Sequence, residues 1–141
     1  MQTQSHLARA SQYADLTQLS ATKLIEHIHR GDISASEAVE AHIARIEQVN
    51  PQLNALVVKR YEAARAEARQ ADERRQAGDE LGPLHGLPVT IKESLDLAGT
   101  ASTFGLSSRQ SHRAAQDESV RRRNEGERRH DDLVAGLHLQ Q

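Results

Sequence analysis

The sequence is 141 residues long, which corresponds to one small domain. Only 2% of it is aromatic, and alanine with 20 copies supplies much of the 37% hydrophobic fraction, which predicts a small helical core and an incomplete or partly disordered unit. The net charge of −2 provides no net basic field to hold nucleic acid, and the absence of cysteine excludes disulfides and thiolate metal sites. No apolar run is long enough to span a bilayer, so we expect a soluble cytoplasmic protein without nucleic-acid or membrane partners.

The N-terminal third predicts a tail followed by a short helix. Residues 1–14 are polar and unpatterned, which indicates a disordered N-terminus. A helix is then expected over residues 20–30, with Ser20 as its N-cap and Gly31 as its left-handed C-terminal residue. Its apolar face consists of Leu24, Ile25 and Ile28.

A longer helix and a strand follow. The helix is expected over residues 35–49, because Ser34 and Glu37 match a capping box and Asn50-Pro51 is expected to end it. Residues 54–58 form a short apolar run rich in β-branched side chains, which predicts a strand.

The next part of the chain alternates helix, loop and strand. Residues 60–76 alternate Arg and Glu with alanine, which predicts a charge-laced helix that packs closely but buries little. Residues 78–86 contain three glycines and a proline and predict a loop. Residues 88–93 alternate apolar and polar side chains, which predicts a strand with one packed face, and residues 99–111 form a connection rich in Gly, Ser and Thr.

One of the three lysines lies at a position that can support chemistry. Lys92 belongs to the predicted strand that follows the Gly-Pro loop, and a lysine held there can be partly desolvated and act as a base. Most lysines on strands nevertheless point into water, so position alone favours an exposed, non-catalytic side chain. The residues around it change this interpretation.

These residues are Gly82-Pro83-Leu84-His85-Gly86-Leu87-Pro88-Val89-Thr90-Ile91-Lys92-Glu93, followed by Asp96-Leu97-Ala98-Gly99 and Thr103-Phe104-Gly105. They resemble the first conserved block of the amidase signature family. Upstream, Ile33-Ser34-Ala35-Ser36-Glu37 and Asn50-Pro51-Gln52-Leu53-Asn54-Ala55 resemble the N-terminal helices and first strand of those enzymes. The resemblance extends from about Leu19 to Glu125 and follows the order of the family's elements.

The resemblance implies an α/β fold, with N-terminal helices and the first strands of a mixed sheet flanked by helices, incomplete in this chain. It also implies amide hydrolysis by a serine, a cis-serine and a lysine, without a cofactor. In that mechanism the neutral lysine accepts the proton of the nucleophilic serine through the cis-serine, while backbone N–H groups stabilise the oxyanion. Lys92 matches the catalytic lysine, and Glu93 stands where the family more often has Asp.

The sequence departs from the family in its serines. The family places both in a later loop of the Gly-Gly-Ser-Ser-Gly-Gly type, and these 141 residues contain no such loop. Ser107-Ser108 is the one serine pair near the lysine, but Leu106 and Arg109 flank it where the loop needs glycines for close approach of backbone donors. We therefore interpret Ser107 and Ser108 as solvated loop residues.

The resemblance stops abruptly near the C-terminus. Residues 117–126 resemble the family's next helix, but Glu127-Arg128-Arg129-His130-Asp131-Asp132 is too polar for the central strand that should follow. Reading the codons one base later permits an apolar strand, so we hypothesise a frameshift near Gly126. The predicted organisation is a disordered segment over 1–14, a partial amidase-signature domain over 15–126, and an aberrant, disordered polar tail over 127–141.

The eight histidines do not predict a metal site. His27 and His29 are two residues apart and point to different faces of a helix, and His85 has no carboxylate or histidine at ligand spacing. We expect no bound metal.

The sequence thus favours a fragment of an amide-bond hydrolase that keeps the catalytic lysine, lacks both serines and is inactive alone, with a small amide as the substrate of the parent family. One alternative is a non-catalytic binding module or subunit whose exposed strands are covered by a protein partner. Others are part of an amidotransferase A-type subunit, which takes part in the related transamidation, or a small amidase that uses Ser107 or Ser108.

Overall fold

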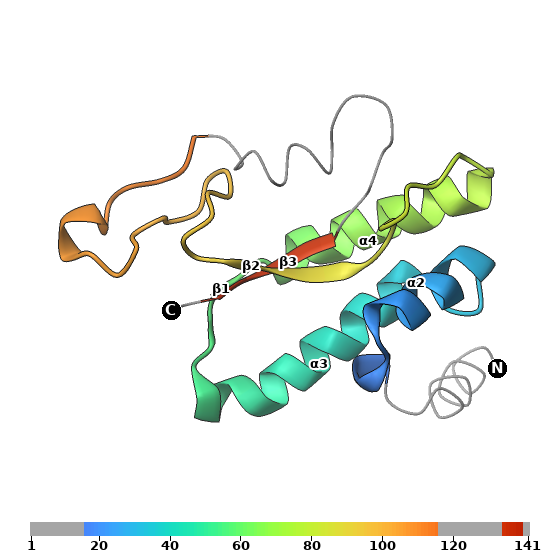
Figure 1. Ribbon diagram of the computed structural model, residues 1–141, viewed down its shortest axis with the longest axis horizontal. Helices are drawn as coiled ribbons and strands as arrows, with labels where there is room; N and C mark the ends of the chain where they lie inside the picture. The colour runs from blue at the N-terminus through green and yellow to red at the C-terminus, as the bar shows by residue number, and fades with distance from the viewer. Residues whose placement is uncertain (1–15, 116–133, 140–141) are drawn as a thin grey trace.

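The structure, a computed structural model, describes residues 16–115 and 134–139 (Figure 1). In chain order its elements are η1 (Leu16–Gln18), α2 (Ala21–Arg30), α3 (Ala35–Leu53), β1 (Leu56–Lys59), α4 (Tyr61–Ala77), β2 (Pro88–Lys92), η2 (Ser107–Arg109) and β3 (Val134–Leu139). The expected disordered N-terminus over 1–14 and the expected helix over 117–126 lie outside the described residues. No helix in the described part of the chain is long and apolar enough to cross a membrane.

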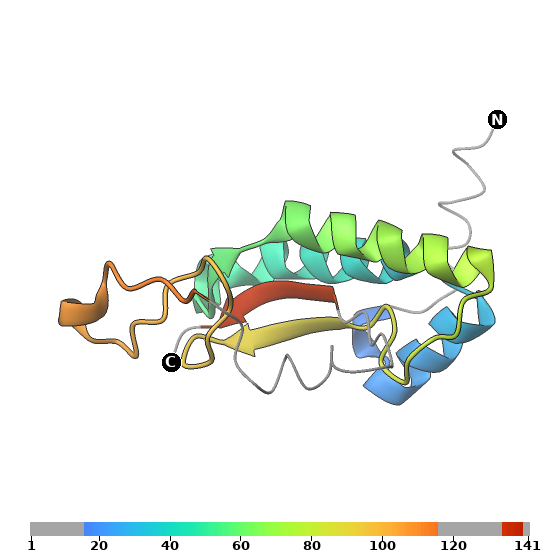
Figure 2. The ribbon, with the colours of Figure 1, turned by 90° about the horizontal axis from the view of Figure 1, so that it is seen from above.

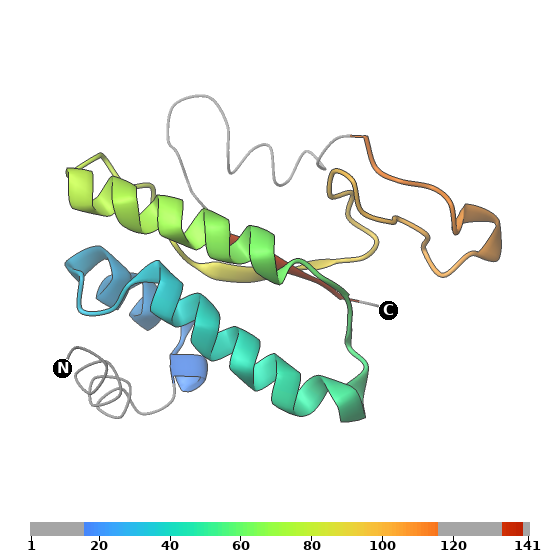
Figure 3. The ribbon, with the colours of Figure 1, turned by 180° about the vertical axis from the view of Figure 1, so that it is seen from behind.

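The strands form a mixed sheet in the order β1-β3-β2. Strand β3 pairs antiparallel with β1 and parallel with β2. Helices α3 and α4 lie side by side against one face of this sheet (Figures 2 and 3), while α2 lies beside the end where β2 begins. The expected fold class, helices flanking a mixed sheet, is confirmed.

Two small apolar clusters hold these layers together. One joins α3 to α4 through small side chains, and its members are Ala35, Val39, Ile43, Ala64, Ala68 and Ala71. The other joins α2 to α3 and to the segment before β2, and its members are Leu24, Ile28, Ile33, Ala38 and Leu87. Alanines let the helices approach closely but remove little apolar surface from water, in agreement with the composition.

The predicted helix caps are present. Ser20 accepts a hydrogen bond from the Lys23 N–H (3.3 Å), and Gly31 has the left-handed conformation that ends α2. At the start of α3, the Glu37 N–H donates to the Ser34 hydroxyl (3.0 Å) and the Ser34 N–H donates to the Glu37 carboxylate (2.8 Å). These local signals therefore determine where both helices begin.

The predicted end of α3 was wrong. The helix continues through Pro51 to Leu53 and ends at Asn54, whose backbone is left-handed. Asn50 explains the extension: its side-chain amide donates to the carbonyl of Leu56 (3.0 Å) and accepts from the N–H of the same residue (2.8 Å). This pair ties the last turn of α3 to β1, a contact that the preference of the residue before proline does not include.

Asp72 makes a contact that sequence reasoning missed. Its buried carboxylate, on α4, accepts hydrogen bonds from the N–H groups of Ala35 (2.7 Å) and Ser36 (3.1 Å) at the first turn of α3. A carboxylate at a helix N-terminus satisfies free N–H groups and interacts favourably with the helix dipole. The two helices are thus joined by charge as well as by alanine packing.

The structure also differs from the prediction of a disordered tail over 127–141. Residues 134–139 form β3, the middle strand of the sheet, and the rest of that tail lies outside the described residues. The prediction extended the polarity of residues 127–132 over the whole segment, whereas the sequence from Val134 to Leu139, VAGLHL, is largely apolar and suits a strand.

Candidate functional site

The loop between α4 and β2 places the strand that carries Lys92. His85, fully buried in this loop, donates from Nε2 to the carbonyl of Ala71 on α4 (2.9 Å). Gly86 has a φ of +75°, and a Cβ at this position would lie 3.0 Å from the Cβ of Ala35 and 3.1 Å from Ile28. A glycine is needed here because the chain passes closely over α2 and α3 in a conformation that other residues rarely adopt.

Lys92 is the last residue of β2, and its side chain is exposed. Its backbone pairs in register with Leu139 of β3, and its carbonyl accepts from the N–H of Leu95 in the turn that follows. The partial desolvation that would suit a base is therefore not provided by the described residues. Strand β2 fixes the backbone position of Lys92, and the side chain is exposed.

Glu93, the residue after Lys92, is buried and holds a distant loop. One of its carboxylate oxygens accepts from the N–H of Thr103, and the other accepts from the N–H of Phe104 (3.1 Å). A buried carboxylate is stabilised by hydrogen bonds of this kind because they replace its lost hydration. Glu93 thus fixes the segment after β2 to the backbone at Thr103 and Phe104.

The loop that Glu93 holds is closed at its base. The N–H of Gly99 donates to the carbonyl of Ala114 (2.9 Å), and the N–H of Ala114 donates to the carbonyl of Thr100 (3.1 Å). Ala101 and Arg113 form an antiparallel bridge across the same base. Figure 1 shows this orange segment extending beyond the end of the sheet, away from the helical layer.

Inside the loop, polar contacts replace an apolar core. The Arg109 guanidinium lies 4.9 Å from the centre of the Phe104 ring and donates from Nε to the carbonyl of Ser102 (3.2 Å). Ser102 is fully buried, and its hydroxyl has no hydrogen-bond partner among the described residues. Phe104 and Leu106 stay exposed, at 45% and 54% of their surface.

Ser107 and Ser108 lie in this loop and are exposed, as the sequence predicted for solvated residues. They form the short helix η2, in which the carbonyl of Ser107 accepts from the N–H of Gln110 (3.3 Å). Neither serine has a glycine beside it, so the loop has no flexible backbone that could serve as an oxyanion site next to them.

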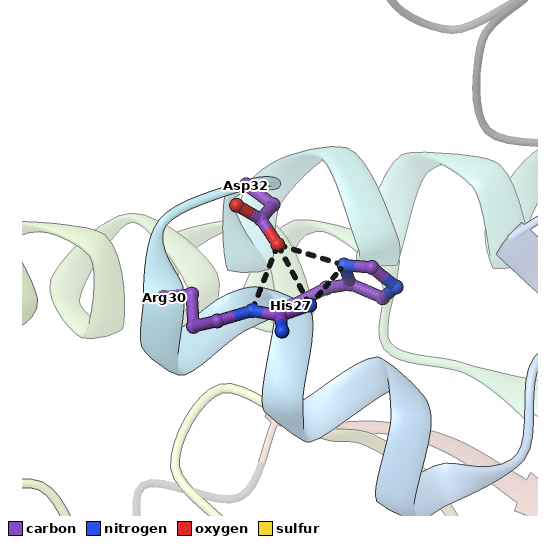
Figure 4. A network of polar contacts seen from close by, with 3 residues as sticks. All are labelled: His27, Arg30 and Asp32. Atoms are coloured by element: carbon purple, nitrogen blue, oxygen red, sulfur yellow. Dashed lines mark hydrogen bonds and ion pairs between the residues drawn. The ribbon is translucent and has the colours of Figure 1, made fainter.

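The histidines near α2 form polar contacts of another kind. Figure 4 shows Asp32 accepting from His27 Nδ1 (2.9 Å) and from Arg30 Nε (3.0 Å) at the C-terminal end of the helix. The hydrogen bond from His27, with the charge of Arg30, lowers the pKa of Asp32. Partial burial and the nearby His85 ring lower the pKa of His29. Within residues 16–115 and 134–139, no group of three or more His, Asp or Glu side chains is placed to hold a metal ion.

The sequence thus indicated Lys92 as a candidate residue but did not predict the contacts of the residues around it. It identified Glu93 only as a longer replacement for Asp, and it attached no importance to Ser102 or to Asp72. The one sequence feature that could have indicated the buried role of Glu93 is its position as a charged residue next to an apolar strand. Its partners, ten or more residues away, gave no pattern in the sequence.

Comparisons with known proteins place these elements in a wider context. The family model described as Amidase matches residues 37–125, more than half of the chain. The indoleacetamide hydrolase of Bradyrhizobium diazoefficiens is 44% identical over 103 residues, which cover 73% of this chain and 20% of that protein. The A-type subunit of the glutamyl-tRNA(Gln) amidotransferase of Salinispora arenicola is 39% identical over 109 residues, or 77% of this chain and 22% of that protein.

A similar arrangement exists in solved structures. The crystal structure of a bacterial aryl acylamidase of the amidase signature family matches 86% of this chain and 24% of its own, with 31% identity and a TM-score of 0.71. This chain spans about a fifth of the length of the relatives that it matches.

Proposed function

Because the chain belongs to the amidase signature family, we propose that it contributes the catalytic lysine of an amide-hydrolysing site and that this lysine is Lys92. The observation that carries the proposal is the family match over residues 37–125, which includes the loop, the strand and the lysine in one continuous segment. The relatives named as an indoleacetamide hydrolase and an acylamidase support amides as the substrate class.

In the proposed reaction, Lys92 acts as a base. Its neutral amine takes a proton from a bridging serine, which takes one from the nucleophilic serine as that oxygen attacks the amide carbon. One proton then returns from Lys92 through the bridging serine to the leaving nitrogen as the C–N bond breaks, and water hydrolyses the acyl-serine ester to a carboxylate and the free serine. A lysine base works best when it is partly desolvated, so in this proposal another part of the site covers the exposed Lys92.

In our proposal, this chain contributes neither the two serines nor the part of the site that covers Lys92. Its 141 residues contain no Gly-Gly-Ser-Ser-Gly-Gly loop, and Ser107 and Ser108 are exposed on η2. We therefore expect the chain by itself to hydrolyse no amide. Its contribution is a folded segment that presents a lysine to the rest of the site.

A chimeric enzyme tests this role directly. The 103-residue segment of the Bradyrhizobium relative that matches this chain would be replaced by the corresponding residues of this chain, and ammonia release from indoleacetamide would be measured. We expect the chimera to be active and Lys92→Met to abolish its kcat. Lys59→Met is the matched control, because Lys59 is also an exposed lysine at the end of a strand of the same sheet.

The proposal fails if a folded, active chimera keeps its kcat when Lys92 becomes methionine, or if Lys59→Met is as damaging. Amide hydrolysis by the 141-residue chain itself, lost on replacement of Ser107 or Ser108, would instead establish the small-amidase alternative.

Assembly with a protein partner is the second candidate role, and exposed apolar side chains favour it. Leu53, Val57, Phe104 and Leu106 expose between 40% and 67% of their surface. Several relatives are named as the A-type subunit of an amidotransferase, so some family members work with protein partners. Light scattering of the chain purified from its native cells would distinguish the two: a stable hetero-complex supports this second role, and a monomer argues against it.

A further inference from the structure

We propose that Glu93 is a positioning residue for Lys92, which it serves by holding the loop at Thr103 and Phe104 against the end of β2; this inference rests on the proposed role of Lys92 as the base. Glu93 has 7% of its surface exposed, and its two oxygens accept from two consecutive backbone N–H groups. The anchor is therefore directional as well as strong.

The direction of the Lys92 side chain depends on how the backbone at Glu93 is held. The side chain of Lys92 is exposed and that of Glu93, the next residue, is buried. A rotation of the backbone that moves one of these side chains therefore also moves the other. Strand pairing fixes the backbone of Lys92 on one side, and the carbonyl of Lys92 accepts from Leu95 on the other. The buried carboxylate of Glu93 lies between these two constraints and fixes the rotation of the chain around the lysine.

The loop itself depends on Glu93 at its tip. Its base is closed by hydrogen bonds between residues 99–101 and 113–114, whereas its tip exposes Phe104 and Leu106. Phe104 has a φ of +52°, a conformation that residues other than glycine adopt at a cost. The hydrogen bond from its N–H to Glu93 helps to hold that conformation.

A carboxylate is an unusual side chain to bury at this position. Packing alone would be served better by an apolar side chain, because a buried carboxylate loses its hydration. A carboxylate at this place is useful if the two backbone N–H groups of the loop must be kept in one orientation relative to the end of β2. The side chain of glutamate is one methylene longer than that of aspartate, and here this length reaches both N–H groups.

The test uses the 141-residue chain and does not need enzyme activity. The variants are Glu93→Gln, which removes the charge at constant size, Glu93→Asp, which keeps it, and Glu80→Gln, a matched control at an exposed glutamate in the preceding loop. Two quantities would be measured: exchange of the Thr103 and Phe104 amide protons by NMR, and acetylation of Lys92 by acetic anhydride as a function of pH. Lys23 and Lys59 serve as internal references in the same molecule.

We expect Glu93→Gln to raise amide exchange at both loop positions and to change the rate of Lys92 acetylation by about threefold or more relative to the reference lysines, as expected when a neighbouring charge and its contacts are lost. Glu93→Asp should restore the pH profile of Lys92 in part, and Glu80→Gln should leave both measurements unchanged. If Glu93→Gln does not fold, an altered Lys92 profile in a folded Glu93→Asp variant supports the proposal and an unaltered one overturns it.

Two results would overturn the inference. Amide exchange that stays slow in Glu93→Gln would mean that the carboxylate does not hold the loop. Faster exchange with an unchanged Lys92 profile would mean that Glu93 is structural only. The proposed function is tested separately by the chimera. If the chimera keeps its kcat when Lys92 becomes methionine, the proposed function fails, but amide exchange and Lys92 acetylation in the 141-residue chain are unaffected.

Discussion

Asp72 in the helical layer and Glu93 beside the candidate site form the same contact in very different surroundings. Each is a buried carboxylate that accepts hydrogen bonds from two consecutive backbone N–H groups far along the chain. Asp72 lies beside closely packed alanines that join α3 to α4. Glu93 connects a strand end to a loop whose tip exposes Phe104 and Leu106.

The same contact, a buried carboxylate that accepts from two backbone N–H groups, therefore has two different effects. In the helical layer, the carboxylate adds to an apolar cluster and caps a helix, so its loss should be felt by the whole domain. At the loop, the carboxylate holds an exposed tip that lies outside the two apolar clusters, so its loss should free a segment while the rest stays folded. Stability and site geometry are therefore separable in this chain.

The strongest test of this comparison replaces each carboxylate by its amide. We expect Asp72→Asn to lower the free energy of unfolding by about 3 kcal/mol, because two N–H groups of a buried helix start lose charge-assisted hydrogen bonds. Glu93→Gln should lower it by about 1 kcal/mol or less, since the loop can open without the core. Urea denaturation followed by circular dichroism gives both values.

Glu73→Gln is the control for α4, because it changes an exposed glutamate next to Asp72. Equal losses for Asp72→Asn and Glu93→Gln would contradict the comparison, since they would place the loop and the helices in one cooperative unit.

Two glycines allow a second comparison between the helical layer and the loop, with a smaller expected change in the free energy of unfolding. Gly86 and Gly99 both have positive φ, +75° and +77°, but a Cβ on Gly86 would meet Ala35 and Ile28, whereas one on Gly99 would meet nothing within 4 Å. We expect Gly86→Ala to destabilise the fold by about 2 kcal/mol, from backbone strain and crowding, and Gly99→Ala by about 1 kcal/mol, from strain alone. Thermal unfolding of the two variants measures the difference, and a larger loss for Gly99→Ala would show that the loop bears more of the stability than its contacts indicate.

The fold was largely predictable because its signals are local. Ser20, Ser34 and Gly31 act on neighbours in the sequence, and the alternation of residues 88–92 reflects one packed face. The errors came from contacts between distant or weakly patterned segments. Asn50 extended α3 through its bonds to Leu56, and a short apolar segment near the C-terminus paired as β3.

The candidate site was predictable only in part for the same reason. Lys92 lies in a recognisable motif, so the sequence could name it. Its exposure depends on which side of β2 is covered, and the anchoring role of Glu93 depends on Thr103 and Phe104, which no periodic pattern connects to it. Long-range polar contacts of single residues are the part of a site that sequence reasoning finds last.

The smallest expected effect concerns pH and the helical side of the comparison. Partial burial and the nearby His85 lower the pKa of His29 in the folded state below 6.5, against a weaker opposing effect of the Gly82 carbonyl. The unfolded chain therefore binds more protons at this position, so stability present above pH 6.5 should be lost as the pH falls through the folded-state pKa.

Urea denaturation above and below pH 6.5 measures this loss, and His29→Gln should reduce it. The contribution of Asp32 falls in a separate range: its pKa is lowered from 3.8, so it loses stability only in more acidic solution. If stability instead rises as the pH falls below 6.5, the contact between α2 and the loop before β2 favours the charged imidazole. In that case a charged His29 imidazole would stabilise the helical side of the molecule, so polar contacts as well as apolar packing would contribute to stability there.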